Sequence, residues 1–220
     1  MKESTMHIEI YSDIVCPWCY VGKRRLERAL ASFGGDADVT WRPFQLNPTM
    51  PLEGMDRKTY LEAKFGSLDA FERLEDQVLA AGAAERIPFA FDQIQRTPNT
   101  FAAHRLIWYA RLQGTQNAMM EALFLSYFVE GQDIGNLETL AQTAAQAGLD
   151  PAMVEAFLKS DDGAVEVGAE EAAGHRLGIR GVPYFVVNGT SAISGAQTSD
   201  RFVSALKRAA ADGAERKAGP

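Results

Sequence analysis

The sequence predicts an α/β fold in which one α/β domain is interrupted by a large α-helical insertion. A β-α-β pattern opens the chain, amphipathic helical stretches fill its middle, and a strand, turn, strand and helix close it. We expect the α/β domain to comprise residues 1–55 and 178–212, the insertion residues 56–177, and a flexible tail residues 213–220. Such an arrangement predicts a two-lobed molecule.

The opening unit is a strand, a helix and a second strand. Residues 7–11 alternate apolar and polar side chains, which is typical of a half-buried strand. Residues 17–33 carry apolar side chains three and four apart, so they predict a helix that ends at Gly34. Residues 39–42 predict the second strand, which Pro43 should stop.

The middle of the chain predicts helices rather than strands. Asn136 is a plausible N-cap, Gly148 follows the end of the same helix, and Asp150 with Pro151 opens another. The expected helical stretches are residues 57–81, 100–113, 117–129, 137–147 and a short helix from residue 151.

The end of the chain returns to β structure. Residues 184–187 form an apolar run, and Asn188-Gly189 is a preferred two-residue hairpin turn. Residues 190–194 then predict the returning strand and residues 199–211 a final helix.

Composition narrows the function. The 220 residues carry a net charge of −7, which argues against a general nucleic-acid binder. No run of 18 apolar residues exists, so we expect no membrane span. No apolar signal-peptide segment precedes the first strand, so we expect a cytoplasmic location.

The chemistry is expected at two cysteines, which are the chain's only ones and open the first helix as Cys16-Pro17-Trp18-Cys19. Cys16 falls near the helix N-cap, where unsatisfied N–H groups and the helix dipole favour a thiolate, and Pro17 suits the first helical position. Cys19 lies one turn further in and should be more buried. Thiol–disulfide exchange needs this asymmetry, because one sulfur attacks and the other resolves the mixed disulfide.

Three other interpretations of the pair are weaker. A structural disulfide would close a four-residue loop and remove little chain entropy. A zinc site needs four ligands, and His7, His104 and His175 show no ligand-like spacing. Two ordinary buried thiols are the third interpretation. A redox pair is favoured over all three because of its β-α-β setting.

A second motif, Gly181-Val182-Pro183, precedes the strand at residue 184. Considered alone, it predicts an ordinary turn with a trans proline, because cis bonds are a small minority of X–Pro bonds.

The segments 13–22 (DIVCPWCYVG) and 178–185 (GIRGVPYF) resemble the DsbA-like branch of the thioredoxin superfamily, and FrnE-type proteins most closely. Segments 98–104 (PNTFAAH) and 130–134 (EGQDI) share the resemblance. It implies a thioredoxin fold with a large α-helical insertion. It also implies that Pro183 is cis and faces the cysteine pair, while the backbone of Val182 binds an extended peptide or glutathione.

Two departures from the family pattern matter. Trp18 stands where DsbA has histidine, so no cationic neighbour stabilises a thiolate and strong oxidising power is less assured. Some FrnE-type proteins carry a second cysteine pair near the C-terminus, and this chain has none.

Other candidate substrate-binding residues rest on the resemblance or on position. Pro17 and Trp18 flank the reactive sulfur. His104 could orient substrate or move protons, with a structural polar contact equally favoured, and Asn99 lies in the same segment. For Asp13, three residues before Cys16, a turn-capping role is favoured. The last candidates precede the final helix and are Gly195, Ala196 and Gln197. In glutathione-binding relatives such a segment holds the γ-glutamyl carboxylate at the helix N-terminus, and a plain strand-to-helix loop is equally favoured.

The expected function is a cytoplasmic protein thiol–disulfide oxidoreductase or isomerase, with Cys16 as nucleophile, Cys19 as resolving residue and Pro183 shaping the groove. It would need no metal and no tightly bound cofactor. Its partners would be cysteine-containing proteins or glutathione, and the oligomeric state is open. The alternatives are a glutathione-dependent isomerase or kappa-class-like glutathione transferase, and a non-enzymatic groove-binding protein.

Overall fold

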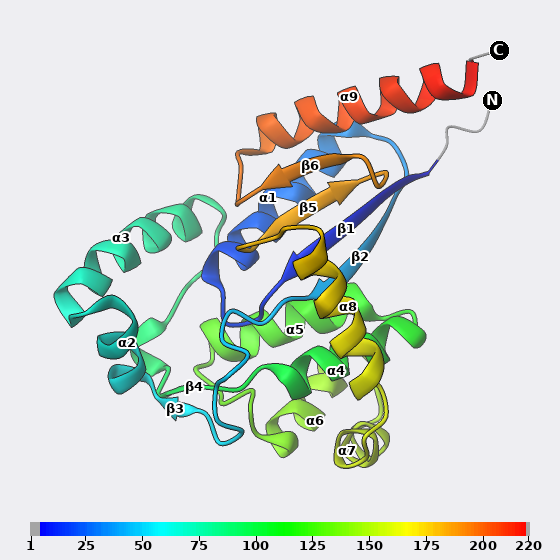
Figure 1. Cartoon of the computed structure of the whole chain (residues 1–220). Coiled ribbons are helices and arrows are strands. Elements are labelled where there is room, and N and C mark those ends of the chain that lie inside the picture. Colours follow the sequence, from blue (N-terminus) through cyan, green and yellow to red (C-terminus); the bar gives the residue numbers. More distant parts are fainter. Residues whose placement is uncertain (1–4, 219–220) are drawn as a thin grey trace.

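The computed structural model describes residues 5–218, without the side chains of residues 68–70 and 213–218. One α/β layer with helices α1 and α9 lies above a block of helices, and the chain passes from the first to the second and back (Figure 1). One continuous cluster of buried side chains joins the sheet to the helical block. The division at residues 55 and 178 stays a prediction.

Four strands form the sheet, in the order β2-β1-β5-β6. Their bounds are Met6–Ser12 (β1), Ala37–Pro43 (β2), Tyr184–Val187 (β5) and Ser191–Ser194 (β6). β1 runs parallel to β2 and antiparallel to β5, while β5 and β6 form the expected hairpin. Asn188 and Gly189 both have positive φ (51° and 69°), as the predicted turn requires.

Two long helices lie against this sheet. Helix α1 spans Pro17–Phe33 as predicted, because proline suits its first position and Gly34 ends it at φ 75°. Helix α9 spans Ser199–Ala218 and packs on α1 (Figure 1). It therefore continues past the predicted end at residue 211, into the segment 213–218 where the sequence predicts a loose tail. Residues 219–220 lie outside the described part.

The helical block contains seven α-helices, a 3₁₀ turn and a short ladder among the described residues. Asn136 and Asp150 cap α6 and α7 as predicted. The bounds are β3 Met55–Asp56, α2 Arg57–Phe65, α3 Leu68–Ala84, the 3₁₀ turn Phe91–Gln93, β4 Arg96–Thr97, α4 Phe101–Leu112, α5 Gln116–Phe128, α6 Leu137–Gln146, α7 Pro151–Lys159 and α8 Ala164–Arg176. None of the helices within residues 5–218 is both long enough and apolar enough to span a membrane.

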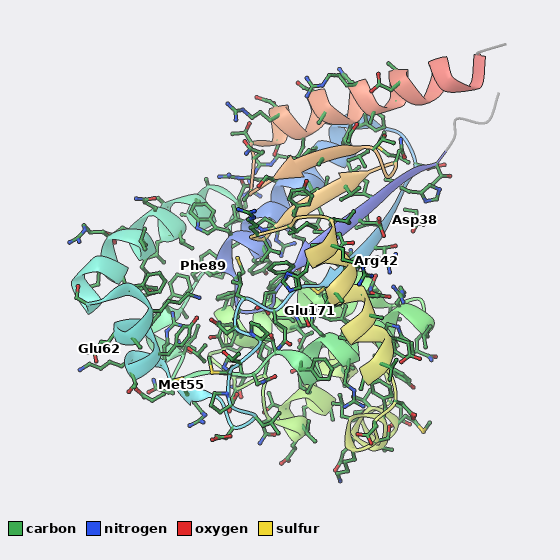
Figure 2. All side chains as sticks on the ribbon, viewed as in Figure 1. Asp38, Arg42, Met55, Glu62, Phe89 and Glu171 are labelled. Atoms are coloured by element: carbon green, nitrogen blue, oxygen red, sulfur yellow. The ribbon has the colours of Figure 1, made fainter. Side chains whose placement is uncertain are left out.

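Two features of the block differ from the sequence prediction. The single helix expected over residues 57–81 is two helices, because Gly66 adopts a left-handed conformation (φ 83°) and ends α2. Helix α8 was not predicted as a separate element. It packs beside β2, where Arg42 pairs with Glu170 at 3.0 Å, and Figure 2 shows Arg42 on β2 next to α8.

Polar side chains join the sheet to the block. At the edge strand β2, the Gln116 side chain accepts a hydrogen bond from Trp41 N at 3.0 Å and donates one to Trp41 O at 3.0 Å. The side-chain amide therefore satisfies backbone groups that an edge strand leaves unpaired. On α1, Lys23 is only 3% exposed and pairs with Glu121 of α5 at 2.7 Å.

A buried arginine holds the end of α7. Arg105 is 7% exposed and donates five hydrogen bonds to four backbone carbonyls at the end of α7 and in the turn that follows. Its positive charge lies at the negative end of the helix dipole.

Candidate active site at the start of helix α1

The tight turn between β1 and α1 places Cys16 at the helix N-terminus. Asp13 O accepts a hydrogen bond from Cys16 N at 3.1 Å, which closes the turn. Cys16 is the N-cap residue of α1 with extended backbone (φ −94°, ψ 108°), and Pro17 follows at the first helical position. The Cys16 side chain makes no capping bond to the backbone of α1.

The two thiols occupy different environments. Both are free in this structure, and Cys16 is 6% exposed whereas Cys19 is wholly buried. Burial raises the pKa of the Cys19 thiol well above its ordinary value of 9.0, and the hydrogen bond with Cys16 raises it further. The predicted order of burial, with Cys19 the more buried of the two, is confirmed.

The Val182-Pro183 peptide bond is cis, as the resemblance implies. The Cys16 thiol donates to Val182 O at 3.6 Å, so this segment lies directly against the reactive sulfur. Gly22 on α1 permits the approach: a Cβ there would lie 3.0 Å from Pro183 Cγ and 3.2 Å from Phe185 Cζ.

A buried acid–base pair lies at the same turn. Asp13 Oδ2 accepts a hydrogen bond from Leu46 N at 2.7 Å, so the carboxylate holds the loop after β2. The turn-capping role favoured for Asp13 from the sequence is therefore wrong. Asp13 Oδ1 is 3.4 Å from His104 Nε2, with both side chains 3% exposed or less. These two atoms approach closely without hydrogen-bond geometry, and neither has another partner among the described residues.

Cys16 opens onto an apolar cavity of about 270 Å³. The segment from Val15 to Trp18 forms one wall, and α2 and α3 form the opposite wall. Tyr60, Phe71, Leu74 and Val78 line it, although their pattern in the sequence predicts only a helical stripe. Sequence reasoning missed this function of the stripe, because an apolar stripe looks the same whether it faces a closed core or a cavity.

Two predicted substrate-binding residues lie away from the cavity wall. His104 is buried against Asp13. Asn99 donates to Met50 O at 2.7 Å and accepts from Phe101 N at 2.9 Å, so its side chain holds the start of α4. Neither lines the cavity, and a role for either in binding substrate stays a prediction.

The segment before α9 does lie beside the cis-proline. Gly195 N donates to Pro183 O at 2.9 Å, and Ala196 O accepts from Arg25 of α1 at 2.6 Å. Gln197 is partly buried; its side chain donates to Ser194 O and accepts from Arg201. These contacts place residues 195–197 beside the site, but they already occupy several polar groups of the segment. Binding of the glutathione carboxylate by these residues stays a prediction.

Comparison with known proteins agrees with this geometry. The YwbO protein of Bacillus subtilis is 30% identical over 207 residues, which is 92% of this chain and 96% of that protein. A probable DsbA oxidoreductase from Streptomyces coelicolor is 37% identical, with a TM-score of 0.86 over 93% of this chain and 89% of the other.

Fold similarity extends to more distant proteins. The cytosolic disulfide reductase DsbM from Pseudomonas aeruginosa, in a structure with GSH, is 16% identical with a TM-score of 0.62, over 97% of this chain and all (100%) of the other. The model of the DSBA-like thioredoxin domain matches residues 7–207. With the cysteine pair at the start of α1 and the cis-proline against it, the chain belongs to the family of DsbA-like thioredoxin domains.

Proposed function

We propose that the protein is a thiol–disulfide oxidoreductase in which Cys16 attacks and Cys19 resolves. The observation that carries this proposal is the asymmetry of the pair: Cys16 lines the cavity, whereas Cys19 lies behind it, wholly buried, with a raised pKa. A structural disulfide or a pair of inert core thiols has no need of a cavity at one sulfur.

The reaction needs only the two cysteines and a disulfide substrate. The Cys16 thiolate attacks one sulfur of the substrate, a Cys16–substrate disulfide forms, and the other half leaves as a thiolate. Cys19 then gives up its proton and attacks the Cys16 sulfur, releasing the second half and closing the Cys16–Cys19 disulfide. Two electrons pass from the protein to the substrate, and the two thiol protons end on the two released thiols.

The cis-proline segment would hold the substrate during this exchange. Val182 O already accepts a hydrogen bond from Cys16, so an extended substrate backbone can lie alongside the reacting sulfur. Glutathione is the redox partner we propose, together with a cytoplasmic location and a place among FrnE-type proteins. The GSH-bound structure of a cytosolic disulfide reductase with the same fold supports the first two, and the sequence segments around Cys16 and Pro183 support the third.

Two serine variants test the division of labour. After incubation with oxidised glutathione, intact-mass spectrometry of Cys19→Ser should show one glutathione adduct, because this variant attacks but cannot resolve. Cys16→Ser should show almost none, because Cys19 is buried. The Cys16→Ser/Cys19→Ser double variant is the matched blank.

The other outcomes are informative. Adducts only on Cys16→Ser would invert the two roles, and equal adducts on both would indicate ordinary thiols. If both single variants kept the full insulin-reduction rate of the parent, the exchange mechanism would be wrong. A glutathione-dependent isomerase would then become the first function to test.

A further inference from the structure

The cavity beside Cys16 carries information about the substrate, and this inference rests on the proposed function. Its wall opposite the cysteine comes from α2 and α3, and aromatic rings from both helices and from the 3₁₀ turn line it: Tyr60, Phe65, Phe71 and Phe91. A cavity walled by aromatic side chains favours an apolar, preferably aromatic, occupant.

The size of the cavity limits the occupant. An apolar cavity of about 150 Å³ holds one benzene molecule. The volume here, about 270 Å³, therefore suits a single substituted or fused aromatic ring system. Cys16 is only 6% exposed and lines this cavity, so the cavity offers a substrate sulfur a route to it. A small molecule with one aromatic ring system fits this volume and can bring its sulfur to Cys16, and it does both better than the surface of a folded protein.

Among the described residues, none accepts a hydrogen bond from the side chain of Arg57, a cation in the cavity wall. The Arg57 guanidinium lies over the rings of Phe71 and Phe91, at 5.7 and 5.6 Å from their centroids. Within the described part of the chain, its side chain makes no hydrogen bond and no ion pair. A half-buried guanidinium whose N–H groups lack acceptors favours binding of a ligand that supplies acceptor oxygens. A carboxylate is such a ligand, because its two oxygens can accept two parallel hydrogen bonds from one guanidinium.

The other charged groups of the cavity leave Arg57 available. Lys64 is exposed at the rim and already donates to Tyr60 Oη at 2.6 Å and to Asn47 Oδ1 at 3.4 Å. Glu75 also lines the cavity, where burial raises its pKa and the charge of Arg57 lowers it. With two cations and one carboxyl group, the cavity keeps a net positive charge when all three are ionised.

We propose that this cavity selects low-molecular-weight aromatic disulfides that carry a carboxylate. The aromatic ring lies between α2, α3 and Trp18, the carboxylate binds Arg57, and the disulfide meets Cys16. Cys16 and Cys19 then reduce the disulfide to two aromatic thiols, by the exchange described above, and the protein ends as the Cys16–Cys19 disulfide.

Rate constants for the reduced protein test the selection. The substrates are 3,3′-dithiodibenzoate, its neutral bis-carboxamide, and 2-hydroxyethyl disulfide as an aliphatic reference. Each rate is divided by that of free 2-mercaptoethanol, a neutral thiol, which removes the intrinsic reactivity of each disulfide. The carboxylate should react at least about tenfold faster than the amide, the factor expected for one charge-assisted hydrogen bond.

Two charge variants on α2 distinguish a direct contact between Arg57 and the substrate carboxylate from a general attraction between positive charge and the carboxylate. Arg57→Gln should bring the carboxylate-to-amide ratio near unity. Lys58→Gln removes the same charge from the neighbouring exposed residue and should keep the ratio of the parent. Equal loss in both variants would overturn the contact with Arg57.

Further outcomes distinguish this inference from the proposed function. If 2-hydroxyethyl disulfide reacts but the carboxylate shows no preference, the substrate class is wrong and the oxidoreductase stands. If no disulfide reacts, both are wrong. A cysteine-containing peptide disulfide that reacts faster than the aromatic carboxylate would overturn the substrate class.

A binding measurement on the unmodified protein covers the case in which Arg57→Gln fails to fold. Naphthalene-2-carboxylate, which contains no sulfur, should slow alkylation of Cys16 by iodoacetamide several-fold, and naphthalene-2-carboxamide should slow it less. Equal protection by both, or by neither, would overturn the proposal.

Discussion

Raising the pH should destabilise the reduced protein through Cys19. Its pKa in the folded protein is raised by burial, so the folded state keeps the proton while the unfolded thiol ionises near its ordinary value of 9.0. The stability contributed by the protonated thiol is complete below that value and is lost as the pH rises above it. With the folded thiol still protonated at pH 10, ionisation of the unfolded chain lowers the free energy of unfolding by about 1.4 kcal/mol.

The assay is urea denaturation at several pH values from 7 to 10. A Cys16→Ser parent prevents disulfide formation, and Cys16→Ser/Cys19→Ala is the matched control. The difference in free energy of unfolding between the two should shrink by about 1.4 kcal/mol across this range. Tyr20 and Tyr127, whose pKa values are also raised by burial, are present in both proteins and cancel. Parallel curves for the two proteins would refute the assignment of Cys19 as a buried, protonated thiol.

Three substitutions test other parts of the structure by urea denaturation at pH 7. Gly22→Val should lower the free energy of unfolding by about 1–3 kcal/mol, because the larger side chain overpacks the contact with Pro183. It should also slow thiol–disulfide exchange by displacing Pro183. Unchanged stability and an unchanged rate would contradict the close fit of Gly22 against Pro183. Arg105→Met should cost about 2–4 kcal/mol, because buried carbonyls lose a charged donor. Glu121→Gln should cost about 1–3 kcal/mol by leaving Lys23 underpaired. Burial raises the pKa of Glu121, but the hydrogen bonds from Lys23 and Tyr20 and the charges of Lys23 and Arg24 together outweigh burial, so the net pKa is lowered. The stability difference should therefore shrink as the pH falls below 4.5, the ordinary pKa of a glutamate, towards the lowered pKa of Glu121 in the folded protein.

The elements predicted best from sequence are those whose ends carry a chemical signal. Helix α1 matches its predicted bounds because Pro17 and Gly34 mark both ends. The caps Asn136 and Asp150 and the Asn188-Gly189 turn are confirmed for the same reason. In each case one residue type satisfies backbone groups or a backbone conformation that others satisfy poorly.

The two differences in the helical block share one cause: an apolar period by itself does not show where one helix ends and the next begins. The period continues through Gly66 and hides the break between α2 and α3. Helix α8 is rich in small and charged residues, and only Val167 and Gly174 are buried, so it shows little period at all. For the site, Cys16, Cys19 and Pro183 could be placed from sequence and resemblance. The cavity could not, because it depends on how α2 and α3 turn toward the cysteines.

The contacts of Glu85 bear on how accurately the site is built. This residue follows α3, and its side chain is 6% exposed. It pairs with Arg25 at 2.9 Å and with Arg28, both on α1. The helix that carries the sulfur atoms therefore also anchors one end of the cavity wall. Because both parts are fixed to α1, small movements between the sheet and helices α4–α7 leave the spacing between the reacting sulfur and this end of α3 unchanged. The distance between the reacting sulfur and this end of α3 is thus fixed by helix α1 and two ion pairs rather than by the packing of the whole molecule.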